Sequence, residues 1–112
     1  MSAISCLSFV FQEAHCIELA LQQLRPYVEE IIIVDQQSLD GTAEIARKYD
    51  VKVHTRPRLI CGDGYREFLR HQATQPWILW FYPDERWPET TLKSFEKLTQ
   101  QDDKVAYGFM RH

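Results

Sequence analysis

The fold is decided by residues 30–42, which read EIIIVDQQSLDGT. The four consecutive branched residues in this stretch favour a β-strand that is buried on both faces, as in the middle of a parallel sheet. In the loop that follows, Asp40 suits the N-cap of a helix over residues 41–49, and Gly41 permits the tight turn before it. The stretch therefore predicts a buried strand that leads within a few residues into a helix.

Strand-like and helix-like segments alternate along the rest of the chain. We expect strands over residues 4–11, 30–34, 51–55, 77–82 and 105–110. Apolar residues recur at helical spacing over residues 13–25 and 41–49, and again after Pro88. A further helix is expected from the end of the loop at Gly64 to about residue 73. Strands that alternate with helices imply right-handed crossovers. The predicted fold class is therefore α/β, with a mostly parallel sheet and helices on both faces.

The aromatic run within residues 77–82 is better explained by packing than by ligand binding. Period-two alternation places one set of side chains on one face of the strand and the other set on the opposite face. The two sets are Ile78, Trp80 and Tyr82, and Trp77, Leu79 and Phe81. Most of these rings then belong to the core, and only Tyr82 and Trp87, near the sheet edge, are candidates to touch a ligand.

The size and charge of the chain limit what it can bind. Its 112 residues, 45% hydrophobic and 26% charged, fit one globular domain with a single core. A formal net charge of −3 and a pI near 5.8 argue against nucleic acid, because binders of the phosphate backbone carry a basic face. The longest apolar run, residues 77–83, is far short of a membrane span, and no signal peptide is evident.

The cysteines and histidines show no ligand pattern. Cys6, Cys16 and Cys61 are odd in number and have no CxxC spacing, and the histidines are scattered singly. This pattern argues against a disulfide framework and a zinc site. It fits a reducing compartment, so we expect a cytoplasmic protein.

Acidic residues follow three of the predicted strands. Glu13 follows the first strand, Asp35 the second, and Asp84 with Glu85 the fourth. Ligands of open α/β sheets bind beyond the carboxyl ends of the strands, so these side chains are expected at one edge. That edge would suit Mg²⁺ or Mn²⁺ carrying a diphosphate, because these cations prefer carboxylate and phosphate oxygens. Acidic residues at strand ends also serve as helix caps and turn formers, which is the structural alternative for each of them.

Other nucleotide and catalytic motifs are missing. The chain has no GxxxxGK[ST] and no GxSxG, and the GDG of residues 62–64 is too short for a dinucleotide fingerprint. A receiver domain is a rival, because its phosphoacceptor aspartate also ends a strand, as Asp35 does. However, a receiver expects paired acids after its first strand, where this chain has Gln12 and Glu13.

Several segments resemble family 2 glycosyltransferases. Residues 31–42 (IIIVDQQSLDGT) resemble the family segment IIVVDDGSTDGT, and residues 73–86 (ATQPWILWFYPDER) are similar to ATGDWILWLDADER, which carries the Asp-x-Asp metal motif. Residues 8–13 (SFVFQE) resemble the opening strand that ends in Asn-Glu, and residues 107–111 (YGFMR) resemble the strand beyond the metal motif. The resemblance covers nearly the whole chain in the right order.

The resemblance implies a GT-A fold whose Rossmann-like half holds a nucleoside diphosphate sugar. Residues 1–112 would form a single such domain, without the acceptor half. Asp35 would contact the base or ribose, and Glu13 and the backbone near Phe9 would line the same pocket. Arg66 aligns with a basic position of the family and would face the phosphates. The alternative, to which we give equal weight, is that Arg66 is an exposed residue of a helix with no ligand contact.

The metal ligand implied by the resemblance is Asp84, with Glu85 close by. This chain has fewer carboxylates than the family at both acidic segments. Tyr82 replaces the first aspartate of the Asp-x-Asp motif, and Gln36 replaces the second aspartate of the earlier pair. Fewer carboxylates should weaken the affinity for a divalent cation.

Three hypotheses remain after the resemblance is taken into account. The first is a donor-site domain of a glycosyltransferase, in which a metal stabilises the departing diphosphate and the missing acceptor half supplies the general base. The second is a non-catalytic GT-A-like module that binds a nucleotide sugar or a protein partner. An unrelated flavodoxin-like or receiver-like domain is the third and weakest alternative. The acceptor and the sugar are not specified by the sequence.

Overall fold

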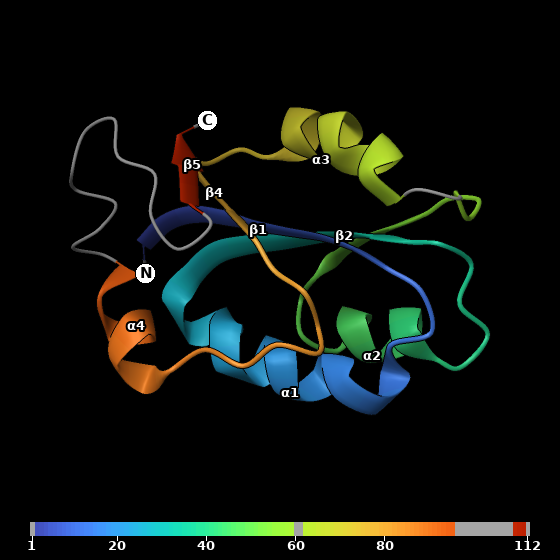
Figure 1. Ribbon diagram of the computed structural model, residues 1–112, viewed down its shortest axis with the longest axis horizontal. Helices are drawn as coiled ribbons and strands as arrows, with labels where there is room; N and C mark the ends of the chain where they lie inside the picture. Colours follow the sequence, from blue (N-terminus) through green and yellow to red (C-terminus); the bar gives the residue numbers. More distant parts are fainter. Residues whose placement is uncertain (1, 60–61, 96–108, 112) are drawn as a thin grey trace.

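The computed structural model describes residues 2–59, 62–95 and 109–111 (Figure 1). The strands are β1 (Ser2–Val10), β2 (Val28–Asp35), β3 (Lys52–Thr55), β4 (Trp77–Trp80) and β5 (Phe109–Arg111). The helices are α1 (Ala14–Leu24), α2 (Thr42–Arg47), α3 (Arg66–Gln72) and α4 (Glu89–Lys93). Two 3₁₀ turns, η1 (Arg25–Tyr27) and η2 (Gly62–Tyr65), lie directly before β2 and α3.

The strands form a mostly parallel sheet, as predicted. The order is β3-β2-β1-β4-β5, and only the β4–β5 pair is antiparallel. Val10 pairs with Asp35, and Asp35 pairs with Thr55, so β1, β2 and β3 end side by side. The residues that follow these strands are therefore brought to the same edge of the sheet.

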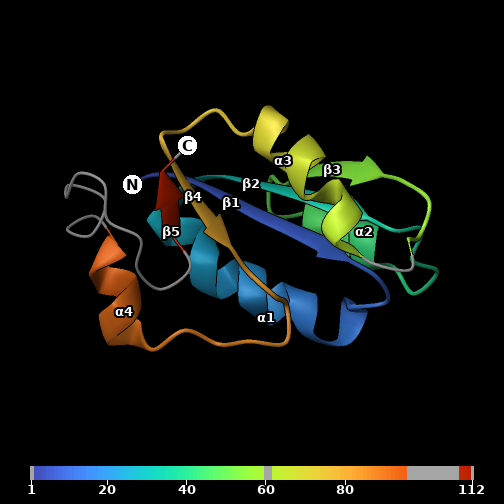
Figure 2. The same cartoon turned by 45° about the horizontal axis from the view of Figure 1, so that its top comes forward.

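Helices cover both faces of the sheet, which confirms the predicted α/β class. Helices α1, α2 and α4 lie on one face, and α3 lies on the other (Figures 1 and 2). The branched run of β2 is buried on both faces, because Ile31 and Ile33 pack in the core under α1 whereas Ile32 and Val34 pack under α3. This two-sided burial is the physical reason for its uninterrupted apolar sequence.

The alternation expected along β4 is also confirmed. Trp77, Leu79 and Phe81 pack in the α1 core. Ile78 and Trp80 pack in the α3 core. The strand ends at Trp80, two residues earlier than predicted, so Tyr82 lies in the turn beyond it and is 41% exposed.

Two predicted boundaries need correction. Helix α2 begins at Thr42, and its N-cap is Gly41 at φ +91°, so Asp40 lies one residue too early to be the N-cap. The helix before Pro26 ends at Leu24, because residues 25–27 tighten into a 3₁₀ turn. Residues 105–108 of the last predicted strand lie outside the described residues, and residues 109–111 form β5.

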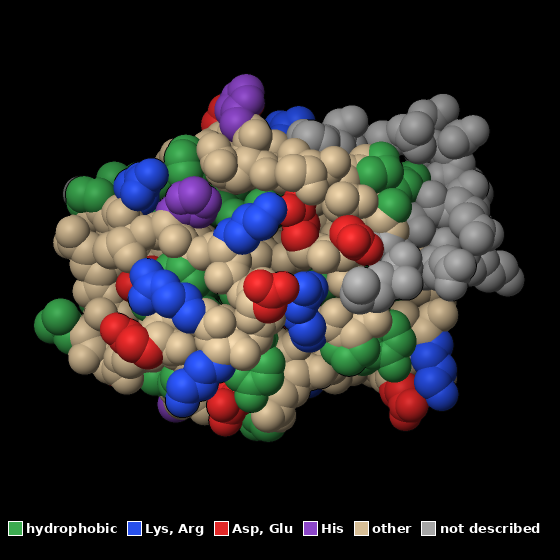
Figure 3. Space-filling view, turned by 180° about the vertical axis from the view of Figure 1, so that it is seen from behind, with side chains coloured by type: hydrophobic (Ala, Val, Ile, Leu, Met, Phe, Trp, Pro, Cys, Tyr) green, Lys and Arg blue, Asp and Glu red, His purple; other side chains and the backbone are tan. Residues whose placement is uncertain are grey.

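Charged side chains of both signs are interspersed on the face shown in Figure 3, where Lys and Arg do not gather into one basic patch. None of the helices in the described part of the chain is long and apolar enough to cross a membrane.

Candidate functional site

The loops that follow β1 and β2 are tied together at the carboxyl edge of the sheet. The Gln12 backbone N–H donates to Ser38 Oγ at 2.8 Å, and the Leu39 backbone N–H donates to Gln12 Oε1 at 2.6 Å. Gln12 and Gln37 both adopt left-handed backbone angles, with φ of 55° and 61°. Two cross-linked turns in uncommon conformations give this edge a fixed shape.

Asp35, the proposed nucleoside contact, is 2% exposed and supports its own loop. Its Oδ2 accepts a hydrogen bond from the Ser38 backbone N–H at 3.1 Å, and its Oδ1 accepts one from Ser38 Oγ at 2.6 Å. The neighbouring Gln36 is also buried, and its Oε1 accepts from the Leu59 backbone N–H at 3.1 Å. Gln36 stands where the family has an aspartate, and its side-chain amide thus holds the loop after β3 in place.

Asp40 joins the first turns of two helices. One carboxylate oxygen accepts from the Ala14 backbone N–H at 3.1 Å, and the other accepts from the Thr42 backbone N–H at 3.2 Å. The Thr42 hydroxyl donates to the same carboxylate and accepts from the Glu13 backbone N–H at 3.0 Å. Asp40 therefore satisfies N–H groups that helix formation leaves without partners at the starts of α1 and α2.

The turn after β4 carries the two predicted metal ligands. The Glu85 backbone N–H donates to the Tyr82 carbonyl at 2.9 Å and closes the turn. The Arg86 side chain stabilises this turn by donating to the carbonyls of Pro83 and Glu85 at 2.7 and 2.8 Å. It also donates to the carbonyl of Cys16 at 3.2 Å, which joins the turn to α1. Asp84 is exposed at the tip of this turn.

Glu13 lies beside Cys16, and Asp84 is close enough to act on the same thiol. Cys16 Sγ donates to Glu13 Oε2 at 3.1 Å. Burial raises the pKa of the Cys16 thiol to about 11, and the Glu13 contact and the charge of Asp84 add to this rise. Two of the predicted acidic residues are therefore brought into one electrostatic environment by the fold.

An arginine-centred cluster was only partly anticipated from the sequence. Arg66 Nη2 donates to the Tyr82 hydroxyl at 3.1 Å. The Arg66 guanidinium lies over the rings of Trp80 and Phe9, at 4.7 and 5.5 Å from their centroids. The rings of Phe9 and Tyr82 also meet edge to face, with centroids 6.5 Å apart. The sequence suggested Arg66, Phe9 and Tyr82 separately, but their contact comes from the pairing of β1 with β4.

Trp87, the other aromatic candidate, lies away from this cluster. Its ring packs against Phe95 at 5.7 Å between centroids, and its backbone N–H donates to Gln23 Oε1 at 2.8 Å. We therefore assign Trp87 to the core between α1 and α4.

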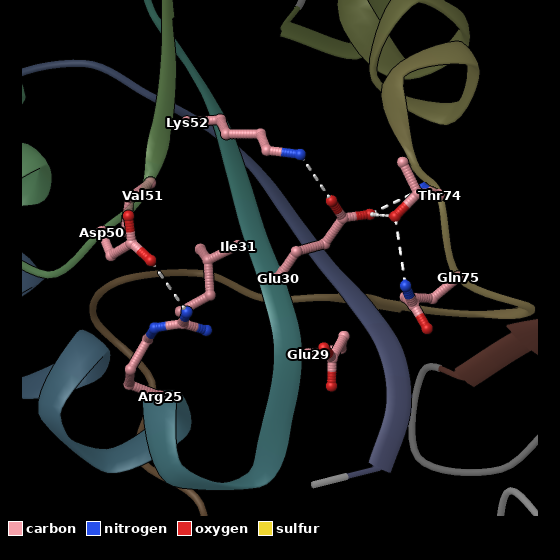
Figure 4. Close-up of a pocket in the computed structure, with 9 residues that line it drawn as sticks. All are labelled: Arg25, Glu29, Glu30, Ile31, Asp50, Val51, Lys52, Thr74 and Gln75. Atoms are coloured by element: carbon pink, nitrogen blue, oxygen red, sulfur yellow. Dashed lines mark hydrogen bonds and ion pairs between the residues drawn. The ribbon is translucent and has the colours of Figure 1, made fainter.

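A pocket of about 290 Å³ lies at the opposite edge of the sheet, where β2 and β3 begin (Figure 4). Within it, Glu30 accepts hydrogen bonds from Thr74 and Lys52, and Arg25 pairs with Asp50. Four of the charged side chains are thus engaged in pairs, Arg25 with Asp50 and Lys52 with Glu30, and we assign this pocket a structural role.

Comparison with known families identifies the family of this chain. The sequence model of Glycosyl transferase family 2 matches residues 10–112. This chain belongs to glycosyl transferase family 2. The match includes both the loop after β2 and the turn after β4, so the resemblance inferred from the sequence is confirmed.

Relatives of this family 2 chain occur in Rickettsia. A Rickettsia felis protein described as an uncharacterized glycosyltransferase is 30% identical over 112 residues, which are 100% of this chain and 36% of that protein. A Rickettsia typhi protein with the same description is 26% identical over 113 residues, covering 100% of this chain and 35% of its own length. The chain thus spans about a third of the length of these curated relatives.

Solved structures share the GT-A fold with this family 2 chain. Glucosyl-3-phosphoglycerate synthase from Mycobacterium tuberculosis, in complex with UDP, is 20% identical with a TM-score of 0.60, covering 76% of this chain and 35% of its own. Mannosyl-3-phosphoglycerate synthase from Rubrobacter xylanophilus is 16% identical with a TM-score of 0.57, covering 77% and 32% of the two chains. The mycobacterial enzyme was also solved with UDP and Mn²⁺ or Mg²⁺.

The side chains of this family 2 chain fit a divalent cation poorly. Position 82 offers a phenol that accepts a hydrogen bond from a guanidinium, in place of a carboxylate. Asp84 and Glu85 are exposed, and within the described residues their carboxylates accept no hydrogen bond that would orient them. Hard cations prefer several oriented oxygens, so the side chains of this turn by themselves fit such an ion poorly.

The described residues contain one other group with metal-ligand atoms close together. Such atoms of Glu13, His15 and Cys16 lie within 4.8 Å of one another. Burial of the Cys16 thiol and the nearby carboxylates of Glu13 and Asp84 raise its pKa and so disfavour the thiolate that would bind a metal.

Proposed function

We propose that this chain is the donor-site half of a glycosyltransferase, which binds a nucleoside diphosphate sugar for transfer to an acceptor hydroxyl. One observation carries the proposal: in a family 2 chain, four of the five candidate residues lie in or just after strands at the carboxyl edge of one sheet, and the fifth, Arg66 at the start of α3, bonds to Tyr82 at that edge. These residues are Phe9, Glu13, Asp35, Arg66 and Asp84. Ligands of open α/β sheets bind at this edge, and the mycobacterial structure named above contains UDP.

The proposed contacts follow from the position of each residue. The loop held by Asp35 and Ser38 would receive the base and ribose, and Glu13 would line the same pocket. Arg66, at the start of α3, and Asp84, in the turn after β4, would face the diphosphate and the sugar. The N–H groups of the guanidinium suit phosphate oxygens, because they form charge-assisted hydrogen bonds with them.

The expected divalent metal stays a prediction, with Asp84 and Glu85 as its proposed ligands. The relatives crystallised with Mn²⁺ or Mg²⁺ support it for the family. The side chains at residues 82–85 fit such an ion poorly. We therefore assign no step of nucleotide binding to the metal. A cytoplasmic location also stays a prediction.

A non-catalytic binding module is the alternative function. The observation that favours it is the structural use of Gln36 and Tyr82, whose side chains bond to Leu59 and Arg66 where the family has carboxylates. Such a module would bind the donor without transferring the sugar. Glycosyl transfer measured with the donor that binds best would distinguish the two functions.

The donor site is tested by calorimetric titration of the chain with UDP, other nucleoside diphosphates and their sugars. We expect saturable binding of at least one of them. Weaker binding by Asp84→Ala in Mn²⁺ but not in EDTA would support the predicted metal role of Asp84. The exposed residue Glu18, on α1, provides a matched control, because Glu18→Ala removes a carboxylate outside the proposed site. If no nucleotide binds, with or without Mn²⁺, the proposed function is wrong.

A further inference from the structure

We propose that the guanidinium of Arg66, held by Tyr82, takes the place of the divalent metal as the group that binds the donor diphosphate. Donor binding by this chain is then independent of metal. The inference rests on the proposed function, since it concerns the same site. It starts from the disagreement between the metal found in related structures and the side chains present here.

The Arg66 guanidinium bonds to the side chain that stands where a metal ligand is expected. Tyr82 aligns with the first aspartate of the family motif, and its hydroxyl accepts a hydrogen bond from Arg66 at 3.1 Å. A fixed positive charge at this position repels a divalent cation and attracts a diphosphate. The replacement of a carboxylate by a phenol thus exchanges a metal ligand for a partner of a guanidinium.

The Arg66 side chain is held in a defined orientation. Its guanidinium lies over Trp80 at 4.7 Å and over Phe9 at 5.5 Å, and both rings come from neighbouring parallel strands. Stacking on aromatic faces and the bond to Tyr82 restrict the rotation of a long side chain before any ligand arrives. A preorganised guanidinium loses less conformational freedom when it binds phosphate.

The loop after β3 adds further positive charge at the same edge. Arg58 lies over the ring of Phe11, which follows β1, at 3.9 Å from the centroid. Arg56 lies over the ring of Phe68 at 5.1 Å, and its backbone N–H donates to the Asp35 carbonyl at 3.0 Å. Arg56 and Arg58 thus add two stacked cations to Arg66 near the carboxyl ends of β1, β2 and β3.

The test compares UDP with uridine, because only UDP carries the diphosphate. Calorimetric titrations are made in EDTA and in Mn²⁺. We expect the same UDP affinity in both media, within about twofold, and much weaker uridine binding. We expect Arg66→Gln to weaken UDP binding by about tenfold or more and to leave uridine binding unchanged, because one charge-assisted phosphate contact is lost.

Two further variants make the test specific. Tyr82→Asp restores a carboxylate to the motif, and we expect UDP binding by this variant to become stronger in Mn²⁺ than in EDTA. Arg70→Gln removes a cation from the same helix, where Arg70 lies 3.8 Å from Glu67, and we expect no change in UDP binding. Circular dichroism of each variant checks that it is folded.

Each result separates this inference from the proposed function. UDP binding that disappears in EDTA and is indifferent to Arg66→Gln would overturn the metal-independent inference and leave the donor site intact. Loss of uridine and UDP binding together in a folded Arg66→Gln variant would also overturn it, because Arg66 would then shape the nucleoside pocket. Absence of binding by UDP and by every other nucleoside diphosphate tested, in both media, would overturn the proposed function itself.

Discussion

The carboxylate of Glu30 accepts hydrogen bonds from both the backbone N–H and the hydroxyl of Thr74, at 2.6 and 2.7 Å. The same carboxylate accepts from the Ser5 hydroxyl and, at 2.9 Å, from Lys52 Nζ. Glu30 therefore connects three neighbouring strands to the loop before β4 (Figure 4). A buried carboxylate with this many donors is strongly stabilised in its charged form.

We expect Glu30 to make the stability of the chain depend on pH in the acid range. Burial raises the pKa of Glu30, but the hydrogen bonds from Ser5, Thr74 and Lys52 outweigh it and lower the pKa from 4.5 to about 2. Because the folded pKa is depressed, the contribution is complete above about pH 4.5 and is lost as the pH falls toward 2. The shift corresponds to at most about 3 kcal/mol. Urea denaturation at a series of pH values measures it.

Glu30→Gln tests the origin of that pH dependence. We expect the variant to lose about 1–3 kcal/mol at pH 7 and to show a flatter profile between pH 4.5 and 2, because charge-assisted bonds are lost. Glu29→Gln, at the exposed neighbouring position, serves as the control and should behave like the parent chain. An unchanged acid profile in Glu30→Gln would show that another group is responsible.

Asp40→Ala is expected to destabilise the starts of two helices at once. The variant removes the acceptor of the Ala14 and Thr42 backbone N–H groups, and loss of such a cap costs about 1–2 kcal/mol. Asp40→Asn retains an acceptor oxygen and should lose less. Thermal or urea unfolding measures these differences. The idea fails if Asp40→Ala unfolds at the same denaturant concentration as Glu18→Ala.

Gly41→Ala is expected to cost about 1 kcal/mol through backbone strain alone. Gly41 has φ +91°, which L residues rarely adopt, and a Cβ there would meet nothing within 4 Å. Gly41→Asn should cost less, because asparagine tolerates left-handed angles better than alanine. Equal free energies of unfolding for Gly41→Ala and the parent chain would contradict this explanation.

Cys16 is expected to react slowly with iodoacetamide at pH 8, because burial and Glu13 raise its thiol pKa to about 11. A raised pKa leaves little thiolate, which is the reactive form. Glu13→Gln removes the charge of Glu13 and should speed alkylation of Cys16, measured peptide by peptide by mass spectrometry. Cys6 is 0% exposed and should stay unmodified in both proteins. Equal Cys16 rates in the two proteins would assign the slow reaction to burial alone.

The sequence predicted the elements of the fold because each carries its own periodicity. The run from Ile31 to Val34 indicated a strand buried on both faces, and the alternation along β4 assigned each residue to its face. Boundaries were less accurate. The start of α2 was placed too early because the left-handed Gly41, rather than the better capping residue Asp40, occupies the N-cap.

The candidate site was predicted as a set of separate residues. Glu13, Asp35 and Asp84 were found because they follow strands, and parallel strands end at a common edge. The bond between Gln36 and Leu59 was not foreseen, because it joins positions 23 residues apart through side-chain geometry. The hydrogen bond from the Ala14 backbone N–H of α1 to the Asp40 carboxylate was likewise not foreseen, because the two residues are far apart in the sequence.

The sequence by itself determined the α/β class, the family and the edge of the sheet at which a ligand would bind, because strand periodicity and strand-end residues are local properties. Only the tertiary structure decided what replaces the missing carboxylate of the metal motif. Arg66 and Tyr82 are 16 residues apart, and the packing of α3 against β1 and β4 brings them within 3.1 Å. Such a contact depends on how distant elements pack, which local sequence patterns do not specify.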